Sequence, residues 1–365
     1  MSFRFSLRGV TAACAVAATV VSGSAAASTI TQNTSWTIQR SGATSTYRVV
    51  AYGDSIFAGY NGGLWSVARR AGPYTTGEYL SHRWNANVEV IRRTKSGAKA
   101  DDIYNNKIIG DRSYMQSSNT RVVVFEMCGN DYLQARSAFT DQTGTCNYSV
   151  LDNAYTACAT YMEKAMQAIN QYATSAKAKV IMNIYYPGYD ADYTLTSCID
   201  PATGRQIMKQ DKFLPLLAKS NWKACTLARQ YGFQCADSFA EMMAGDYDSN
   251  GDGLNDVDGL RYQPGESEAS YVNRITTTLR ATVRDANAHY ANGSTSYDYI
   301  QSDNTHPTYY KSSTIGLNVF TGSGSGSGAS DFTDAQIVGG KNPEWNKTGH
   351  ERSGWSLSTY NPAAP

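Results

Sequence analysis

The feature that most constrains the fold of this chain is a repeated alternation of short apolar, β-branched runs with helical stretches. The runs predict strands at residues 47–52, 88–92, 121–127, 180–185 and 233–237. Apolar residues with helical spacing predict helices at 154–173 and 222–231, with mixed loop and helix at 63–84. Strands that alternate with helices in this way predict an α/β fold, in which helices cover both faces of a parallel sheet.

Three short blocks of turn-forming residues follow directly after predicted strands. They are Gly53-Asp54-Ser55, Ser96-Gly97-Ala98 and Gly129-Asn130-Asp131. In an open parallel sheet, the loops that follow the carboxyl ends of the strands meet at one edge, where ligands bind. We therefore expect the three blocks to lie close together. A fourth block, Asp303-Asn304-Thr305-His306-Pro307, comes much later in the chain.

Together the blocks contain every part of a serine acyl-transfer site. A hydroxyl such as that of Ser55 needs a general base, and the base needs a carboxylate that orients it. His306 supplies an imidazole, and Asp303 precedes it by three residues. The N–H groups of Ser55 and Gly97 and the side-chain amide of Asn130 are the expected donors to the oxyanion, with glycine allowing a close approach of the backbone.

In this order, the blocks resemble those of the SGNH hydrolases, also called the GDSL esterase/lipase family, with Ile56 in place of the usual leucine. The family's invariant residues match Ser55, Gly97, Asn130 and His306, and its Asp-x-x-His block matches Asp303 and His306. The resemblance spans roughly residues 47 to 310. It implies a flavodoxin-like, three-layer α/β/α fold and hydrolysis of carboxylic esters.

The chain departs from the family pattern after Pro307. Family members often continue from this point directly into a helix that carries a further Gly-His, whereas here some forty residues separate Pro307 from Gly349-His350. We interpret residues 308–347, with the Gly/Ser tract at 322–328, as an insertion. His350 is an alternative base, but it lacks an aspartate at the right distance upstream.

The N-terminus has the pattern of a secretory signal peptide over residues 1–27. Arg4 and Arg8 precede an apolar run at 10–21, and Ala25-Ala26-Ala27 offers a cleavage site. A retained membrane anchor is the alternative. We expect residues 28–365 to form a single catalytic domain, with insertions at about 189–221, 241–266 and 308–347. Export predicts a secreted or periplasmic protein without stable insertion in a membrane.

Export also affects the interpretation of the cysteines. Cys14 lies in the signal peptide, and an even number of cysteines in an oxidising compartment predicts disulfides among the rest. Spacing favours Cys146–Cys158 and Cys225–Cys235, which leaves Cys128 with Cys198. A metal site made of cysteines is the competing interpretation, and the absence of a Cys-x-x-Cys spacing argues against it.

Residues 248–256 place oxygen ligands at alternate positions with glycine at the sixth, as in the first half of an EF-hand loop. The predicted calcium ligands are Asp248, Asn250, Asp252, the carbonyl of Leu254 and Asp256, with Asp246 or Asp258 in addition. Position twelve is Gly259 instead of the bidentate glutamate, and a solvated acidic turn is the alternative. A calcium ion here would be structural. No cofactor is expected for catalysis.

Composition narrows the substrate class. A net charge of +1 gives no long-range attraction to nucleic acid. A mean hydropathy of −0.43 and tyrosine clusters at 185–193 and 309–310 favour short-acyl or carbohydrate esters, either small molecules or polysaccharides. A lipase or phospholipase acting on longer acyl chains is the alternative activity. A non-catalytic carbohydrate-binding protein is the alternative from another class. The oligomeric state stays open.

Overall fold

The computed structural model describes residues 30–63, 66–67, 71–184, 194–239, 260–281 and 306. Several predictions fall outside these residues: the signal peptide, Asp303, the calcium loop, the tyrosine clusters, the Gly/Ser tract and His350. The described part contains the whole predicted sheet, three of the four motif blocks and the histidine of the fourth.

Five strands form the parallel part of the main sheet. They are β3 (Thr46–Gly53), β6 (Asn87–Ser96), β7 (Thr120–Phe125), β8 (Ala178–Met182) and β11 (Gln234–Ala236). They pair in the order β6-β3-β7-β8-β11, and every pair is parallel. Counted along the chain this order is 2-1-3-4-5, which is the flavodoxin-like arrangement. The predicted fold class is therefore confirmed, although β6 is longer than the strand expected at 88–92.

Two N-terminal strands that the sequence did not reveal extend the sheet beyond β6. β1 (Ile30–Thr31) and β2 (Thr34–Ile38) both pair with β6 in the antiparallel sense. β2 alternates between half-buried and exposed residues. This alternation is typical of an antiparallel strand with one face in contact with solvent. These strands cover the edge of β6, which would otherwise present unpaired backbone groups.

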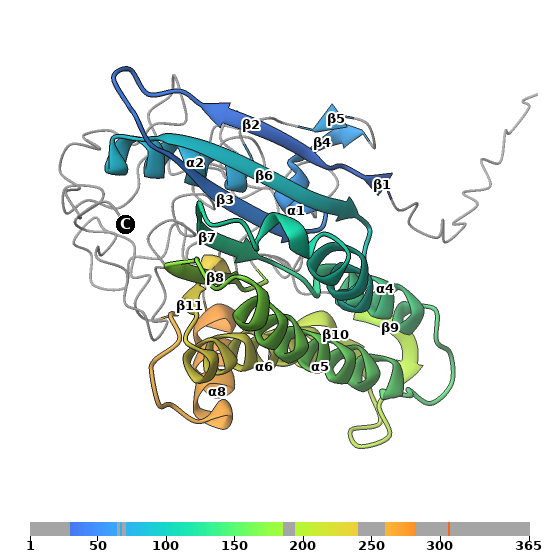
Figure 1. The fold of residues 1–365 in the computed structure, drawn as a ribbon. Coiled ribbons are helices and arrows are strands. Elements are labelled where there is room, and N and C mark those ends of the chain that lie inside the picture. The colour runs from blue at the N-terminus through green and yellow to red at the C-terminus, as the bar shows by residue number, and fades with distance from the viewer. Residues whose placement is uncertain are drawn as a thin grey trace, which may run out of the picture.

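Helices flank the sheet, and right-handed crossovers decide on which face each helix lies. α2 (Gly72–Trp84) connects β3 to β6 and packs on β6 and β3. The later connections run in the opposite direction across the sheet, and their main helices are η1 (Ile103–Ile109), α5 (Ser149–Tyr172) and α6 (Lys209–Tyr231). In Figure 1, α4, α5, α6 and α8 gather at the β8 and β11 end of the sheet, whereas α2 lies at the β6 and β3 end.

The other described elements are helices and two hairpins. The helices are α1 (Ser55–Ala58), α3 (Ala100–Asp102), the 3₁₀ turn η2 (Arg112–Tyr114), α4 (Gly129–Thr140) and α8 (Glu268–Ala281). One hairpin pairs β4 (Tyr60–Gly63) with β5 (Ser66–Val67), and the other pairs β9 (Thr194–Ile199) with β10 (Gln206–Met208). α8 packs against α6. None of the described helices is long and apolar enough to cross a membrane.

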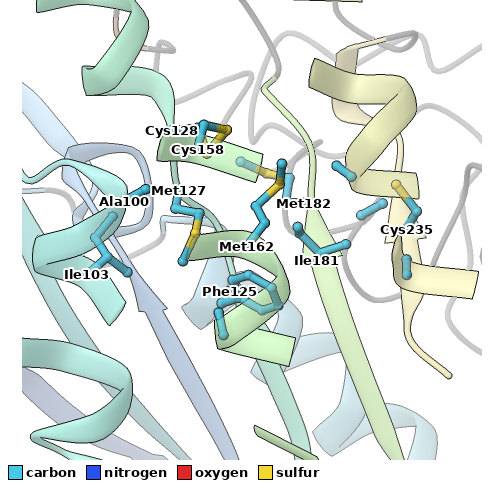
Figure 2. Packing of buried hydrophobic residues seen from close by; sticks show 14 of the residues in the cluster. Ala100, Ile103, Phe125, Met127, Cys128, Cys158, Met162, Ile181, Met182 and Cys235 are labelled. Atoms are coloured by element: carbon cyan, nitrogen blue, oxygen red, sulfur yellow. A yellow bond between two sulfur atoms is a disulfide. The ribbon is translucent and has the colours of Figure 1, made fainter. Parts of the chain in front are cut away.

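The core lies between the central strands and the helices on either face. Figure 2 shows Phe125 at the end of β7, Met162 of α5 and Ile181 of β8 packed together, with Met127 beside them. All four side chains are at most 4% exposed. Because the helix contributes apolar residues at helical spacing, its inner face fits against the sheet and anchors the carboxyl end of β7.

Helix α6 is longer than the sequence indicated. We expected a helix at 222–231 and a loop-rich segment before it, but the helix begins at Lys209 and includes Pro215. The buried residues Phe213, Leu214 and Leu217 give this first half a helical apolar face. Proline inside the segment obscured that pattern, since proline normally ends a helix.

The structure contains three disulfides, and two of the expected pairings are wrong. Cys225–Cys235 is confirmed, but Cys128 pairs with Cys158 and Cys146 pairs with Cys198. Spacing misled because Cys158 is a buried residue of α5 that points toward the start of α4, away from Cys146. Cys146 lies next to β9 instead, where its N–H donates to the Ile199 carbonyl at 2.9 Å.

Candidate active site

The three strand-end blocks meet at one edge of the sheet, as predicted. β3 lies between β6 and β7 and runs parallel to both, so the residues after Gly53, Ser96 and Phe125 leave the sheet on the same side. The chain passes from β3 to β6 on one side and then returns to β7 on the other. A crevice for a ligand forms at such a point of reversal in an open α/β sheet.

Ser55 is the first residue of helix α1, which follows β3 after a single connecting residue. That residue, Asp54, is the N-cap, and its Oδ1 accepts a hydrogen bond from the Ile56 N–H at 2.9 Å. The helix ends after one turn at Gly59, whose φ of 76° favours a residue without a side chain. This short, capped turn gives Asp54 a structural role and holds Ser55 at the edge of the sheet.

His306 reaches Ser55 from the far end of the sequence. Its Nε2 lies 2.7 Å from the Ser55 Oγ, within the distance expected for a general base and its nucleophile. The imidazole also stacks on the ring of Tyr60, with the centroids 4.0 Å apart and the planes inclined by 28°. Tyr60 was not predicted as a site residue, because a single tyrosine after a glycine follows no recognisable pattern.

Asn130 lies at the start of α4, with only 8% of its surface exposed. Its Nδ2 donates to Asp54 Oδ2 at 2.8 Å and to the Ala98 carbonyl at 3.0 Å. One side chain thus connects the turn that carries Ser55 to the loop that carries Gly97. Both hydrogens of the amide have protein acceptors in this structure.

The loop after β6 turns at Gly97, where φ is 77°. A second contact from α4 fixes this loop, since Asp131 Oδ2 accepts a hydrogen bond from the Ala100 N–H at 2.9 Å. Asp131 lies in the first turn of α4, whose N-cap residue, Cys128, makes no capping hydrogen bond through its side chain. Burial raises the pKa of Asp131 to about 7, although the Ala100 N–H opposes the shift.

The backbone N–H groups expected to bind an oxyanion are those of Ser55 and Gly97. Among the residues that the structure describes, the N–H groups of Ser55 and Gly97 donate no hydrogen bond. Ser55 follows Asp54 in the sequence, and Gly97 precedes Ala98. The Asn130 amide donates hydrogen bonds to both Asp54 and Ala98, and so connects the two turns that carry these N–H groups. These are the donors that sequence reasoning selected.

The start of α4 is held by a disulfide. Cys128 has a φ of 84°, a left-handed conformation that costs a residue with a side chain about 1–2 kcal/mol. Its bond to Cys158 ties this turn to α5 (Figure 2). The disulfide excludes a role for Cys128 as a free thiol. Because Cys128 lies two residues before Asn130, the disulfide also helps to fix the position of Asn130.

One buried carboxyl group at the site was not predicted. Glu126 follows β7 directly, is 4% exposed and accepts a hydrogen bond from the Asp54 N–H at 2.5 Å. No sequence pattern identified it as a site residue, because a lone glutamate at the end of an apolar strand is normally exposed. Among the described residues, no group of three or more His, Cys, Asp or Glu side chains is arranged to hold a metal ion.

Comparison with known proteins gives a likeness of fold. No protein-family model and no curated sequence matches the chain. Among solved structures, a lipase from a goat rumen metagenome is 14% identical with a TM-score of 0.48, covering 76% of this chain and 98% of that one. An acetylxylan esterase from Geobacillus stearothermophilus is 11% identical with a TM-score of 0.41, covering 77% and 94%. The protein TesA is 14% identical with a TM-score of 0.39, covering 76% and 97%.

Proposed function

We propose that this protein is an exported serine esterase that hydrolyses carboxylic esters of short acyl groups, including acyl groups on carbohydrates. The observation that carries the proposal is the distance of 2.7 Å between His306 Nε2 and Ser55 Oγ. The chain brings these atoms together across 251 residues, at the edge of the sheet where the other two blocks also lie. A buried serine that only capped a helix would not need an imidazole at this distance.

In the proposed reaction, the Ser55 Oγ attacks the acyl carbon of the ester while His306 Nε2 takes its proton. The protonated imidazole then gives this proton to the leaving alcohol as the acyl-enzyme forms. Water attacks the acyl-enzyme in the second half of the reaction, with His306 again acting as the base. Asp303, three residues before His306 in the sequence, is the carboxylate that we propose to orient the imidazole.

The negative charge on the carbonyl oxygen requires donors that are already in place. The N–H groups of Ser55 and Gly97 are proposed as two of them, because neither has an acceptor among the described residues. The Asn130 amide is proposed as the third. It would share one hydrogen between the oxyanion and the Ala98 carbonyl, as three-centre hydrogen bonds allow.

Export and calcium binding are parts of the same proposal. Three disulfides among the described residues are typical of a protein that matures in an oxidising compartment. A structural calcium ion is proposed for the loop at 248–256. Extracellular loops of this kind bind calcium with modest affinity, so the ion would be sensitive to chelators.

Hydrolysis of p-nitrophenyl esters over a series of acyl lengths tests the proposal, with S55A and H306A as matched variants. Active-site labelling with a fluorophosphonate reports whether Ser55 is activated, and parallel assays with EDTA test the calcium ion. We expect turnover of acetate and propionate esters, loss of both turnover and labelling in S55A, and a lower melting temperature in EDTA.

The outcomes separate the alternatives. A maximum at long acyl chains would replace the short-acyl assignment with a lipase activity. No Ser55-dependent hydrolysis and no labelling at any acyl length would contradict the enzyme assignment and favour a binding protein. An unchanged melting temperature in EDTA would contradict the calcium site alone.

A further inference from the structure

Asp54 and Glu126 form a pair of buried carboxyl groups directly behind the nucleophile. Asp54 is 1% exposed and Glu126 is 4% exposed. Glu126 Oε1 accepts the Asp54 N–H at 2.5 Å, which brings the two carboxyl groups close enough for each to affect the pKa of the other. Neither carboxyl group forms part of the mechanism described above.

The backbone leaves space for Glu126 at this position only because residue 53 is glycine. A Cβ atom at Gly53 would lie 2.3 Å from Glu126 Oε1 and 2.9 Å from its Cδ. Contacts below 3.0 Å between such atoms require one group to move. Glycine at the last position of β3, Gly53, is therefore what allows the Glu126 side chain to occupy this place.

A hydrogen bond between two carboxyl groups requires one proton, because a carboxylate has no donor. Asp54 accepts hydrogen bonds from the Ile56 N–H and the Asn130 amide, which favours the charged form there. Burial and repulsion from Asp54 raise the pKa of Glu126 well above its ordinary value. Burial also raises the pKa of Asp54, but its hydrogen bonds and His306 oppose that shift. These opposing effects favour a neutral Glu126 beside a charged Asp54.

We propose that Glu126 is a positioning residue, whose carboxylic acid donates to the Asp54 carboxylate and thereby fixes both Ser55 and Asn130 for catalysis. This inference rests on the proposed esterase function. The Asp54 carboxylate caps the helix that begins at Ser55, by accepting the Ile56 N–H, and also accepts a hydrogen bond from the Asn130 amide. When Glu126 fixes the Asp54 carboxylate, it therefore also fixes the orientation of the Ser55 turn and of the Asn130 amide. Glu126 touches no reacting atom and acts only through Asp54.

The test compares E126M, which keeps the length of the side chain without its polar atoms, with E126Q. The amide in E126Q retains one acceptor for the Asp54 N–H and one donor for the Asp54 carboxylate. G53A is a second route to the same defect, because its methyl group displaces the carboxyl group while Glu126 remains. T120V is the matched control: Thr120 is fully buried at the opposite end of β7, where it donates to the Tyr114 carbonyl at 3.2 Å.

For each variant we would measure kcat per fluorophosphonate-labelled site, KM for p-nitrophenyl acetate, and the melting temperature. Loss of two oriented groups predicts that E126M and G53A lower kcat per labelled site by about tenfold to a hundredfold, with KM changed less than about threefold. E126Q should restore kcat to within about threefold of the wild type. T120V should lose stability without losing kcat per labelled site.

A merely structural role for Glu126 would lower the labelled fraction and the melting temperature, but would leave kcat per labelled site unchanged in E126M and G53A. That result would overturn the inference while the esterase function stands. An E126Q variant as slow as E126M would also overturn it, since the donor to Asp54 is present in E126Q. No Ser55-dependent hydrolysis in the wild type would overturn both proposals together.

Discussion

Asn130 donates its side-chain amide to Asp54 at 2.8 Å, so the residue proposed to bind the oxyanion also fixes the residue next to the nucleophile. The same amide holds the Ala98 carbonyl in the loop that carries Gly97. A substitution of Asn130 is therefore expected to change both kcat and the free energy of unfolding. The two quantities have to be measured separately.

The first prediction concerns Asn130→Ala. Loss of one oxyanion donor lowers kcat by roughly a hundredfold to a thousandfold. The Asp54 carboxylate and the Ala98 carbonyl also lose a buried partner, which lowers the free energy of unfolding by about 1–3 kcal/mol. Assays of kcat per labelled site and urea denaturation measure the two effects independently. Unchanged turnover in a folded N130A protein would contradict the oxyanion role.

The second prediction concerns the stacking of Tyr60 on His306. An aromatic contact of this kind contributes about 0.5–1.5 kcal/mol beyond burial, so Tyr60→Ala lowers kcat by about threefold to tenfold. Tyr60→Phe keeps the ring and should keep most of the activity. Steady-state assays of both variants check this. Equal losses in Y60A and Y60F would show that the hydroxyl group matters instead of the ring.

The third prediction concerns the disulfide between Cys128 and Cys158, which closes a sequence separation of 30 residues. Loop entropy predicts that C128S/C158S loses about 3–4 kcal/mol of stability. It should also lower kcat, because the left-handed turn before Asn130 loses its covalent support. C225S/C235S is the control, since that disulfide joins α6 to β11 over a separation of 10. This control should lose stability only. Equal kcat in the two double variants would contradict a link between the disulfide and the site.

The fourth prediction concerns pH and Asp131, whose pKa burial raises to about 7 from its ordinary value of 3.8. The folded state thus binds this proton more tightly than the unfolded chain. The stability that it contributes is fully present below about pH 4 and is lost as the pH rises through about 7. D131N removes this titration but keeps a carbonyl oxygen for the Ala100 N–H.

Denaturation of the wild type and D131N between pH 4 and pH 8 measures this contribution as a difference. The stability of D131N relative to the wild type should increase with pH over that range. Using the difference cancels the contributions of the other buried carboxyl groups, Asp54 and Glu126. A difference that does not depend on pH would show that Asp131 does not titrate there.

The sequence alone predicted that Ser55, the two loops beside it and His306 belong to one candidate site, and it did so for a physical reason. Short blocks after parallel strands must meet at one edge of the sheet, so Ser55, Gly97 and Asn130 could be placed without long-range information. His306 was identified by the residue type that a serine nucleophile needs. Its distance of 2.7 Å from Ser55 shows that this chemical argument identified the correct contact.

Other features depend on contacts that no local pattern encodes. Glu126 and Tyr60 belong to the site because of what lies opposite them in space: the backbone of Asp54 and the ring of His306. The pairing of Cys146 depends on its contact with β9, which brings Cys198 close from 52 residues away. Strands β1 and β2 were missed because short, half-exposed segments have weak patterns, and pairing with β6 determines their structure.

The pairing of β1 with β6 also fixes the position of Ile30, the first described residue, relative to the proposed site. Ile30 lies opposite Ser96, the residue immediately before Gly97, and Gln32 contacts the Ser96 hydroxyl. Any polypeptide joined ahead of Ile30 therefore starts beside the loop that carries one of the proposed oxyanion donors. An affinity tag at that end would crowd the rim of the crevice, so recombinant versions of this protein should carry tags elsewhere or have them cleaved before assay.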